Sequence, residues 1–216
     1  MKKLKRWNRG LAAAAVLIIG VILFQIIDQT RFQSSLSEIS ALIQDYEAKS
    51  SEALSRGETA GFLEIMEQYW EDPGTVSQAM RYSTTRSSFY ELLDDETVFL
   101  PLACRETLQS CKIRKSGPGV CQAELTLDST VWLDQYGSYL GCFGAGYAYN
   151  ESAEDYTQEL EAPDSVKNGS QVIRQSSQLH VLLQLSETEG TWKINYSQMY
   201  AASSASELAD REEVPV

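Results

Sequence analysis

The polarity pattern of the chain begins with a basic segment followed at once by an apolar one. Residues 11–27 contain no charged side chain. A helix of this length spans roughly 25 Å, slightly less than a hydrocarbon core of about 30 Å, and Trp7 and Gly10 can extend it. The pattern predicts a transmembrane helix over residues 10–28. The first nine residues hold no acid and five cations, namely Lys2, Lys3, Lys5, Arg6 and Arg9.

The basic flank also predicts the orientation of this helix. Positively charged segments stay on the cytoplasmic side, so residues 1–9 form a cytoplasmic tail and everything after Asp28 lies outside the cell membrane. The alternative is a cleaved secretory signal, which needs a small-x-small site after the apolar run. The run instead ends in Phe24, Gln25, Ile26 and Ile27. We therefore expect a single-pass signal-anchor.

Apolar residues then recur at helical spacing between Leu36 and Leu54, with polar residues between them. Gly57 supplies the left-handed residue that ends such a helix, and a second helix begins at Glu58. Asp72-Pro73-Gly74 ends the second helix, and a third segment, residues 75–93, is expected to be helical at least in part. The buried stripe of the second helix is predicted to contain Phe62, Leu63, Ile65, Met66, Tyr69 and Trp70.

After residue 96 the period of the pattern changes from 3.6 to 2, which indicates strands. The alternation is clearest where Cys121 and Leu127 share one face with Ala123 and Leu125. The closing pair of strands is joined by a turn at residues 187–190, and residues 150–171 are expected to form a loop or an exposed hairpin tip. The predicted strands are 98–104, 108–114, 120–127, 131–133, 139–149, 172–185 and 191–200.

One folded domain, residues 30–200, accounts for the rest of the chain, followed by a disordered acidic tail, residues 201–216. Of 18 Lys+Arg, five lie in the N-terminal tail, which leaves 13 against 30 Asp+Glu outside, a charge of −17. Such a domain repels polyanions, and the cluster of Lys112, Arg114 and Lys115 is too small to offset this. We expect no nucleic-acid partner.

The four cysteines, Cys104, Cys111, Cys121 and Cys142, fall within 39 residues of the outer part. An oxidising compartment favours two disulfides among them, with three connectivities open and buried free thiols as the alternative. Their spacing lacks the short paired gaps of a zinc site, and His180 is the only histidine. We expect no metal and no cofactor.

The order of helices followed by antiparallel strands is that of an α+β domain. A short glycine turn, Ser55-Arg56-Gly57-Glu58, joins the two helices, and a Gly190-Thr191-Trp192-Lys193-Ile194 phrase opens the last strand. In these features the chain resembles the nuclear transport factor 2-like superfamily, a cystatin-like α+β group, over residues 36–200. The resemblance implies a curved antiparallel sheet wrapped around helices, with a cone-shaped cavity. The cysteine-containing middle departs from the common pattern.

The resemblance implies no single activity, because this fold hosts enzymes, pocket binders and assembly subunits. Isomerases and cyclases of the fold use a cavity carboxylate with a Tyr, or a His-Asp pair, but no residue here carries over as catalytic. Tyr46 and Tyr69 are expected in the core, and Glu64 and Glu67 in solvent. His180 is expected to face away from the apolar side of its strand. The residues expected to line the cavity are Trp70, Tyr90, Trp132 and Trp192.

These features favour a bacterial, membrane-anchored extracytoplasmic module that binds another protein or a small ligand and is not an enzyme. One specific form is an assembly subunit of a conjugation or type IV secretion machine, since such bitopic subunits pair one N-terminal span with an outer domain of this fold. The alternative is an isomerase- or cyclase-like enzyme with a cavity carboxylate and Tyr. A largely structural or immunity-type protein is a third class.

Overall fold

The computed structural model describes residues 2–80, 83–88, 98–148, 154–155 and 172–201. The chain divides into two units, residues 1–39 and 40–216. The first unit is the N-terminal part of helix α1, Lys2–Ser55. Large apolar side chains between Leu11 and Ile27 are 48–71% exposed. This helix is long and apolar enough to cross a membrane.

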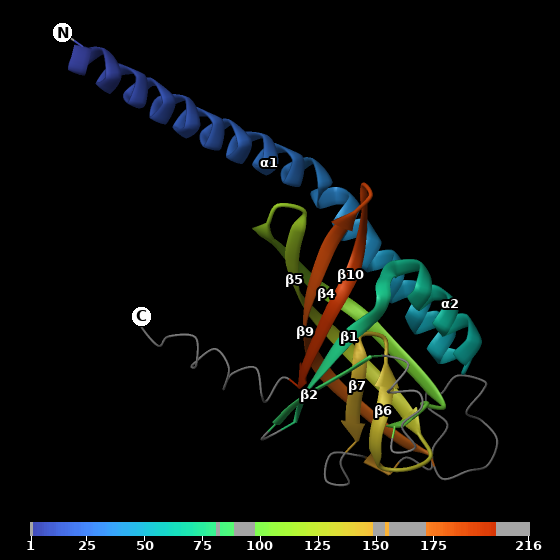
Figure 1. Ribbon diagram of the computed structural model, residues 1–216. Helices are drawn as coiled ribbons and strands as arrows, with labels where there is room; N and C mark the ends of the chain where they lie inside the picture. Colours follow the sequence, from blue (N-terminus) through green and yellow to red (C-terminus); the bar gives the residue numbers. More distant parts are fainter. Residues whose placement is uncertain (1, 81–82, 89–97, 149–153, 156–171, 202–216) are drawn as a thin grey trace. The chain divides into compact units, whose positions relative to one another are not determined.

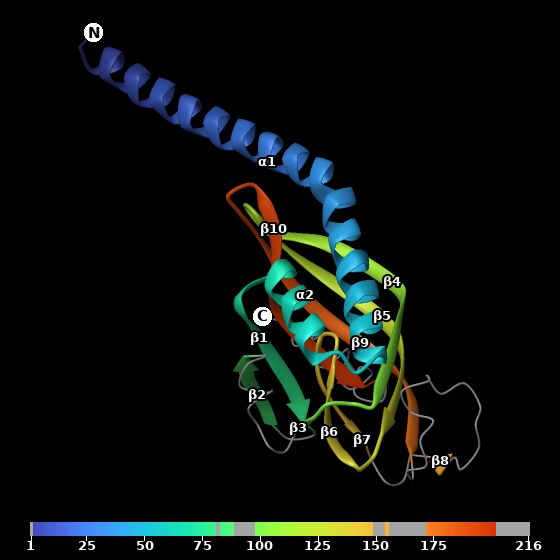
Figure 2. The ribbon, with the colours of Figure 1, turned by 90° about the vertical axis from the view of Figure 1, so that its right-hand side faces the viewer.

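The second unit begins with the remainder of α1 and continues into α2, Thr59–Tyr69. Gly57 ends α1 in the left-handed conformation, with a φ of 68°. The Gly57 N–H donates to the Leu54 carbonyl at 3.1 Å and the Glu58 N–H to the Ala53 carbonyl at 2.9 Å. These two bonds form a Schellman motif, so the helix end predicted at Gly57 is confirmed. Figure 2 shows α2 leading directly into the first strand, β1.

A seven-stranded sheet makes up most of the second unit (Figure 1). Its path is β2–β1–β10–β9–β5–β4, and β8 pairs with β9 off this path. At its centre β5 and β9 pair antiparallel from Val120↔Ser186 to Leu133↔Ile173. The strands are β1 Trp70–Met80, β2 Ser83–Ser88, β4 Ala103–Gly117, β5 Val120–Leu133, β8 Glu154–Asp155, β9 Ile173–Thr188 and β10 Thr191–Ala201.

A second sheet of three strands, in the order β3–β6–β7, packs inside the unit. Its strands are β3 Val98–Phe99, β6 Gly137–Gly141 and β7 Gly144–Ala148. The turn between β6 and β7 is tied to the main sheet, because the Ser197 hydroxyl on β10 donates to the Phe143 carbonyl at 2.5 Å. This turn therefore lies next to the core.

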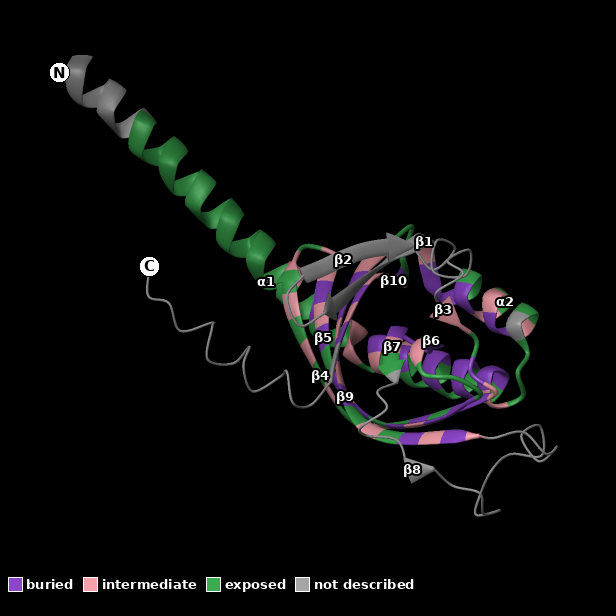
Figure 3. Cartoon of the chain, turned by 90° about the horizontal axis from the view of Figure 1, so that it is seen from below, coloured by how far each residue is buried: buried purple, intermediate pink, exposed green. Residues whose placement is uncertain are grey.

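Burial alternates along the long strands of the main sheet, as Figure 3 shows by colour. On β5 the predicted apolar face is confirmed, since Cys121, Ala123, Leu125 and Leu127 are at most 2% exposed. On β9, Leu179 and Val181 are buried while His180 between them is half-buried, as expected. The inner face of the sheet is covered by the buried side of the C-terminal part of α1, which includes Ile43, Tyr46, Ala53 and Leu54.

The α+β fold predicted from the sequence is confirmed, with an antiparallel majority in its sheet. The prediction of a helix over residues 75–93 is wrong for residues 75–80 and 83–88, the part of this segment that the structure describes. Thr75 to Met80 belong to β1, which lies parallel to β10, and 83–88 form β2. The β-branched and hydroxyl residues of this segment suit a strand, and pairing with β10 determines its conformation. Residues 89–93, most of the 150–171 loop and the tail from 202 lie outside the described residues.

Several of the predicted strands also differ in their bounds. Residues 98–104 contain β3 and the start of β4, with residues 100–102 outside any strand. Residues 120–127 and 131–133 belong to one strand, β5, because β4 and β9 pair with it continuously on both sides. Residues 139–149 contain parts of two strands, β6 and β7, because Gly141 and Gly144 pair with each other around a tight turn. The last two differences come from pairing partners distant in sequence or from the turn chemistry of glycine.

Candidate functional site

A buried carboxyl group, that of Glu106, lies at the centre of a polar cluster inside the second unit. Glu106 is 3% exposed and shares one face of β4 with Cys104, while Arg105 and Thr107 are exposed on the other. Its backbone N–H donates to the Ser51 hydroxyl oxygen at 3.0 Å, and that hydroxyl lies 3.3 Å from the Glu106 carbonyl. Ser51 therefore binds the C-terminal part of α1 to β4 beside the carboxyl group.

One thiol donates to this carboxyl group, that of Cys104, which lies 3.8 Å from Oε1 of Glu106. Cys142 follows β6, directly after Gly141. Gly141 lets the carboxyl group approach this closely, because a Cβ there would lie 2.8 Å from Oε1 of Glu106.

Two tyrosines complete the cluster. Tyr46 on α1 is fully buried and its hydroxyl donates to the Cys142 carbonyl at 2.5 Å. Its ring centroid lies 5.3 Å from that of Phe143 in an edge-on arrangement. Tyr139 on β6 is 1% exposed. Burial raises the pKa of both hydroxyls, so both tyrosines are neutral at physiological pH.

A second acid, Glu47, follows Tyr46 on α1 and is 9% exposed. Burial, together with the nearby Glu106 carboxyl group, raises the pKa of Glu47 to about 7. Burial also raises the pKa of Glu106. The two acids thus lie in one apolar environment and disfavour each other's charge.

A buried carboxylic acid with a raised pKa beside tyrosines has the composition of a proton-transfer site. In this cluster, however, the hydrogen bonds end on the protein itself. The Tyr46 proton goes to a main-chain carbonyl, and the Cys104 thiol proton goes to the Glu106 carboxyl group. Within the described parts of the chain, no group of His, Cys, Asp and Glu side chains could hold a metal ion.

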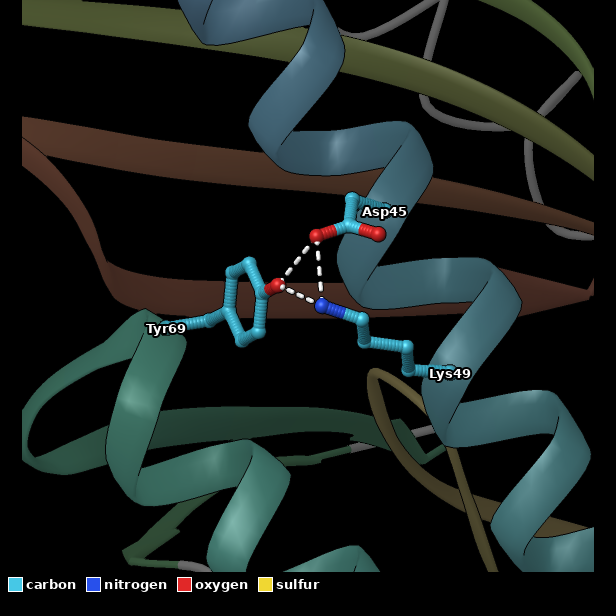
Figure 4. A network of polar contacts seen from close by, with 3 residues as sticks. All are labelled: Asp45, Lys49 and Tyr69. Carbon is cyan, nitrogen blue, oxygen red and sulfur yellow. Dashed lines mark hydrogen bonds and ion pairs between the residues drawn. The ribbon is translucent and has the colours of Figure 1, made fainter.

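A second polar network joins the two helices near the surface (Figure 4). The Tyr69 hydroxyl donates to Asp45, and the Lys49 ammonium lies 2.8 Å from Oδ2 of Asp45 and 2.7 Å from the Tyr69 hydroxyl. Hydrogen bonding to Lys49 lowers the pKa of Asp45. Since the Asp45 and Lys49 side chains are about half exposed, this network fixes α2 against α1 with little net stabilisation.

The structure separates the candidate residues identified from the sequence. Cys104 and Cys142 meet in the buried cluster, Cys121 is buried on β5 and Cys111 is half-buried on β4. All four are free thiols in the structure. The disulfides expected from the sequence stay a prediction. Among the expected cavity residues, Trp70, Trp132 and Trp192 are 2–4% exposed, whereas Tyr90 lies outside the described residues.

Neither Glu106 nor Glu47 was singled out from the sequence, although a periodic signal was available for each. Glu106 alternates in phase with Cys104 along β4, which places it on the inner face. Glu47 lies four residues after Ile43 and seven before Leu54, in phase with the buried stripe of α1. The positions expected in solvent, Glu64 and Glu67, are indeed exposed.

No protein-family model and no curated protein sequence matches the chain. Solved structures with a similar fold do exist. An uncharacterised protein with a cystatin-like fold from Caulobacter vibrioides is 16% identical, with a TM-score of 0.44, over 81% of this chain and 95% of its own. An NTF2-like protein of unknown function from Shewanella baltica is 11% identical, with a TM-score of 0.40, over 77% and 94%.

A third similar structure is a hexachlorocyclohexane dehydrochlorinase of LinA type 3 from Novosphingobium barchaimii. It is 7% identical, with a TM-score of 0.44, over 82% of this chain and 90% of its own. At such identities and TM-scores, the likeness carries nothing about activity.

Proposed function

We propose that this chain is a membrane-anchored extracytoplasmic module whose folded domain binds another protein and has no catalytic activity. An assembly subunit of a secretion or conjugation machine is the specific form that we favour. The observation that carries the proposal is the apolar segment of α1, whose large side chains are 48–71% exposed. A contiguous apolar surface of this size requires a membrane or a partner to cover it.

The charges around the segment support one orientation. Five cations and no acid precede it, and the chain beyond carries a charge of −17 from 13 Lys+Arg and 30 Asp+Glu. The positive-inside rule then puts the N-terminus in the cytoplasm and the domain outside. An acidic domain would select a partner with a complementary basic surface.

The buried cluster supports binding over catalysis. Glu106 is 3% exposed, Tyr46 is fully buried, and the Tyr46 hydroxyl donates inside the protein to the Cys142 carbonyl. An isomerase- or cyclase-like activity has one observation in its favour, the buried Glu106 acid beside two tyrosines. It would require the β6–β7 turn to move away, which the Ser197 and Tyr46 hydrogen bonds to this turn oppose.

Cysteine labelling in intact cells tests the topology. In a Cys111→Ser background, Ser116→Cys places a thiol at an exposed residue of β4, and Asn8→Cys places one in the basic tail. A membrane-impermeant maleimide should label Ser116→Cys in intact cells and Asn8→Cys only after permeabilisation. The reverse pattern would overturn the proposed orientation.

Photocross-linking tests the binding role. A photoreactive amino acid at Gln178, exposed on β9, should form a cross-link to one extracytoplasmic protein, identified by mass spectrometry. The same group at Asn8 is the matched control and should not reach that protein. Glu106→Gln, which keeps the shape and removes the acid, should leave the cross-link intact. Loss of the cross-link in a folded Glu106→Gln variant would instead favour a role for the acid in ligand chemistry.

A further inference from the structure

The pairing of strands decides which cysteines can meet. Cys111 lies opposite Leu125, whereas Cys121 lies opposite Lys115, with no register shift between these pairs. Four positions along a strand separate the two thiols by roughly 13 Å, and a disulfide needs Cα atoms within about 7 Å of each other. Cys104 is further away still, since it faces a residue ten positions along β5 from Cys121. The two-disulfide expectation therefore does not fit this fold.

Only one pair remains within reach. Cys142 directly follows Gly141, where a Cβ would lie 2.8 Å from the same Glu106 oxygen to which the Cys104 thiol donates, and both cysteines are fully buried. Cys142 is held in place by the hydrogen bond from the Tyr46 hydroxyl to its carbonyl at 2.5 Å. Because Cys142 lies against Cys104, it is as far from Cys111 and Cys121 as Cys104 is.

We propose that Cys104 and Cys142 are joined by a disulfide in the mature protein, which links β4 to the β6–β7 turn, while Cys111 and Cys121 stay reduced. The inference rests on the proposed function for its location, because an extracytoplasmic compartment supplies the oxidising conditions. The bond closes a loop of 39 residues that includes all of β5 and β6. It joins the main sheet covalently to the smaller one.

The oxidant is a disulfide donor, either a dithiol oxidase or oxidised glutathione. One cysteine thiolate attacks a donor sulfur, forms a mixed disulfide and releases one donor thiol. The second cysteine thiolate then attacks the mixed disulfide at the cysteine sulfur and releases the second donor thiol. The two electrons and both cysteine protons thus end on the reduced donor. Since both sulfurs are fully buried after folding, the donor reacts before the β6–β7 turn packs.

The change in hydrogen bonding around Glu106 follows directly. The disulfide removes the Cys104 thiol donor from the Glu106 carboxyl group. Gly141 keeps the space beside Oε1 open in either state. Glu106 therefore stays buried next to the new bond.

Oxidative refolding of the full chain tests the pairing. The chain is unfolded under reducing conditions in detergent, refolded with reduced and oxidised glutathione, unfolded again with N-ethylmaleimide and mapped by mass spectrometry. We expect a linked Cys104–Cys142 peptide and alkylated Cys111 and Cys121. The oxidised protein should unfold roughly 8–15 °C above the reduced one. Four alkylated cysteines, or any other linked pair, would overturn the inference.

Two double variants keep the test decisive. Cys111→Ala with Cys121→Ala should still lose two hydrogen atoms on oxidation and keep the difference in Tm. Cys104→Ala with Cys142→Ala should lose both. If the second variant does not fold, the mass of the first still decides whether the pair forms.

The same mapping in cells separates the two proposals. Cells are quenched in acid and their thiols are alkylated before the chain is purified. A bond that forms with glutathione and also in cells supports both proposals. A bond that forms with glutathione but not in cells keeps the pairing and refutes the extracytoplasmic location, and a bond in neither refutes the pairing.

Discussion

The pKa of Glu47 makes the stability of the domain depend on pH, and Glu47→Gln isolates that dependence. Burial raises the pKa of this carboxyl group from 4.5 to about 7 in the folded chain. Between these values the unfolded chain releases its proton while the folded chain retains it. The free energy of unfolding therefore falls as pH rises from 4.5, and stops falling once the folded form also ionises above about 7.

The size of the effect follows from the shift. One pKa unit corresponds to about 1.4 kcal/mol, so a shift of this size costs about 3 kcal/mol at pH 8 relative to pH 4.5. Since Glu47 is only 9% exposed, solvent screens the effect little. Glu47→Gln removes the ionisation and keeps the shape. It should match the wild type near pH 4.5 and exceed its stability by about 2–3 kcal/mol at pH 8.

The assay is urea unfolding of the full chain in detergent, followed by tryptophan fluorescence between pH 4.5 and 8. Glu106, whose pKa is also raised, contributes in the same direction in both proteins, so their difference reports Glu47 together with its coupling to Glu106. Glu64→Gln on the exposed side of α2 is the matched control and should change stability by less than about 0.5 kcal/mol. If the wild type and Glu47→Gln lost the same stability between pH 4.5 and 8, Glu47 would not be a buried acid with a raised pKa.

Two further predictions concern the cluster around Cys142. Tyr46→Phe leaves the Cys142 carbonyl without its 2.5 Å hydrogen bond, so urea unfolding should show a loss of about 1–3 kcal/mol with the fold intact. Gly141→Ala introduces a Cβ 2.8 Å from Oε1 of Glu106 and should destabilise by about 1–3 kcal/mol. Gly117→Ala, with nothing within 4 Å, is its control. Equal Tm values for the two alanine variants would contradict the close approach at Gly141.

The elements that the sequence predicted well are those whose pattern is local. The glycine cap at Gly57 and the alternation along β5 depend on neighbours a few residues away, and both are confirmed. Residues 75–80 failed because their strand exists only through pairing with β10, more than a hundred residues later. The local spacing of apolar residues gives no information about so distant a partner.

The buried cluster was only half predictable, for a related reason. Cys104 and Cys142 were identified as candidates, but spacing could not show that they meet, because β4 and the β6–β7 turn approach through tertiary packing. Glu106 and Glu47 resemble ordinary solvent-facing acids when their residue type alone is considered. The signal that could have identified them is their spacing from buried neighbours on the same strand or helix face.

The parallel pairing of β1 with β10 also sets the order in which the chain can fold. β1 joins the main sheet only through β10, its other neighbour being β2. Residues 70–88 must therefore wait until Thr191–Ala201 has emerged, which makes folding slow and dependent on contacts distant in sequence. Under the proposed extracytoplasmic location the chain crosses a membrane in extended form, and this delay then keeps β1 from joining the sheet until nearly all of the domain has crossed.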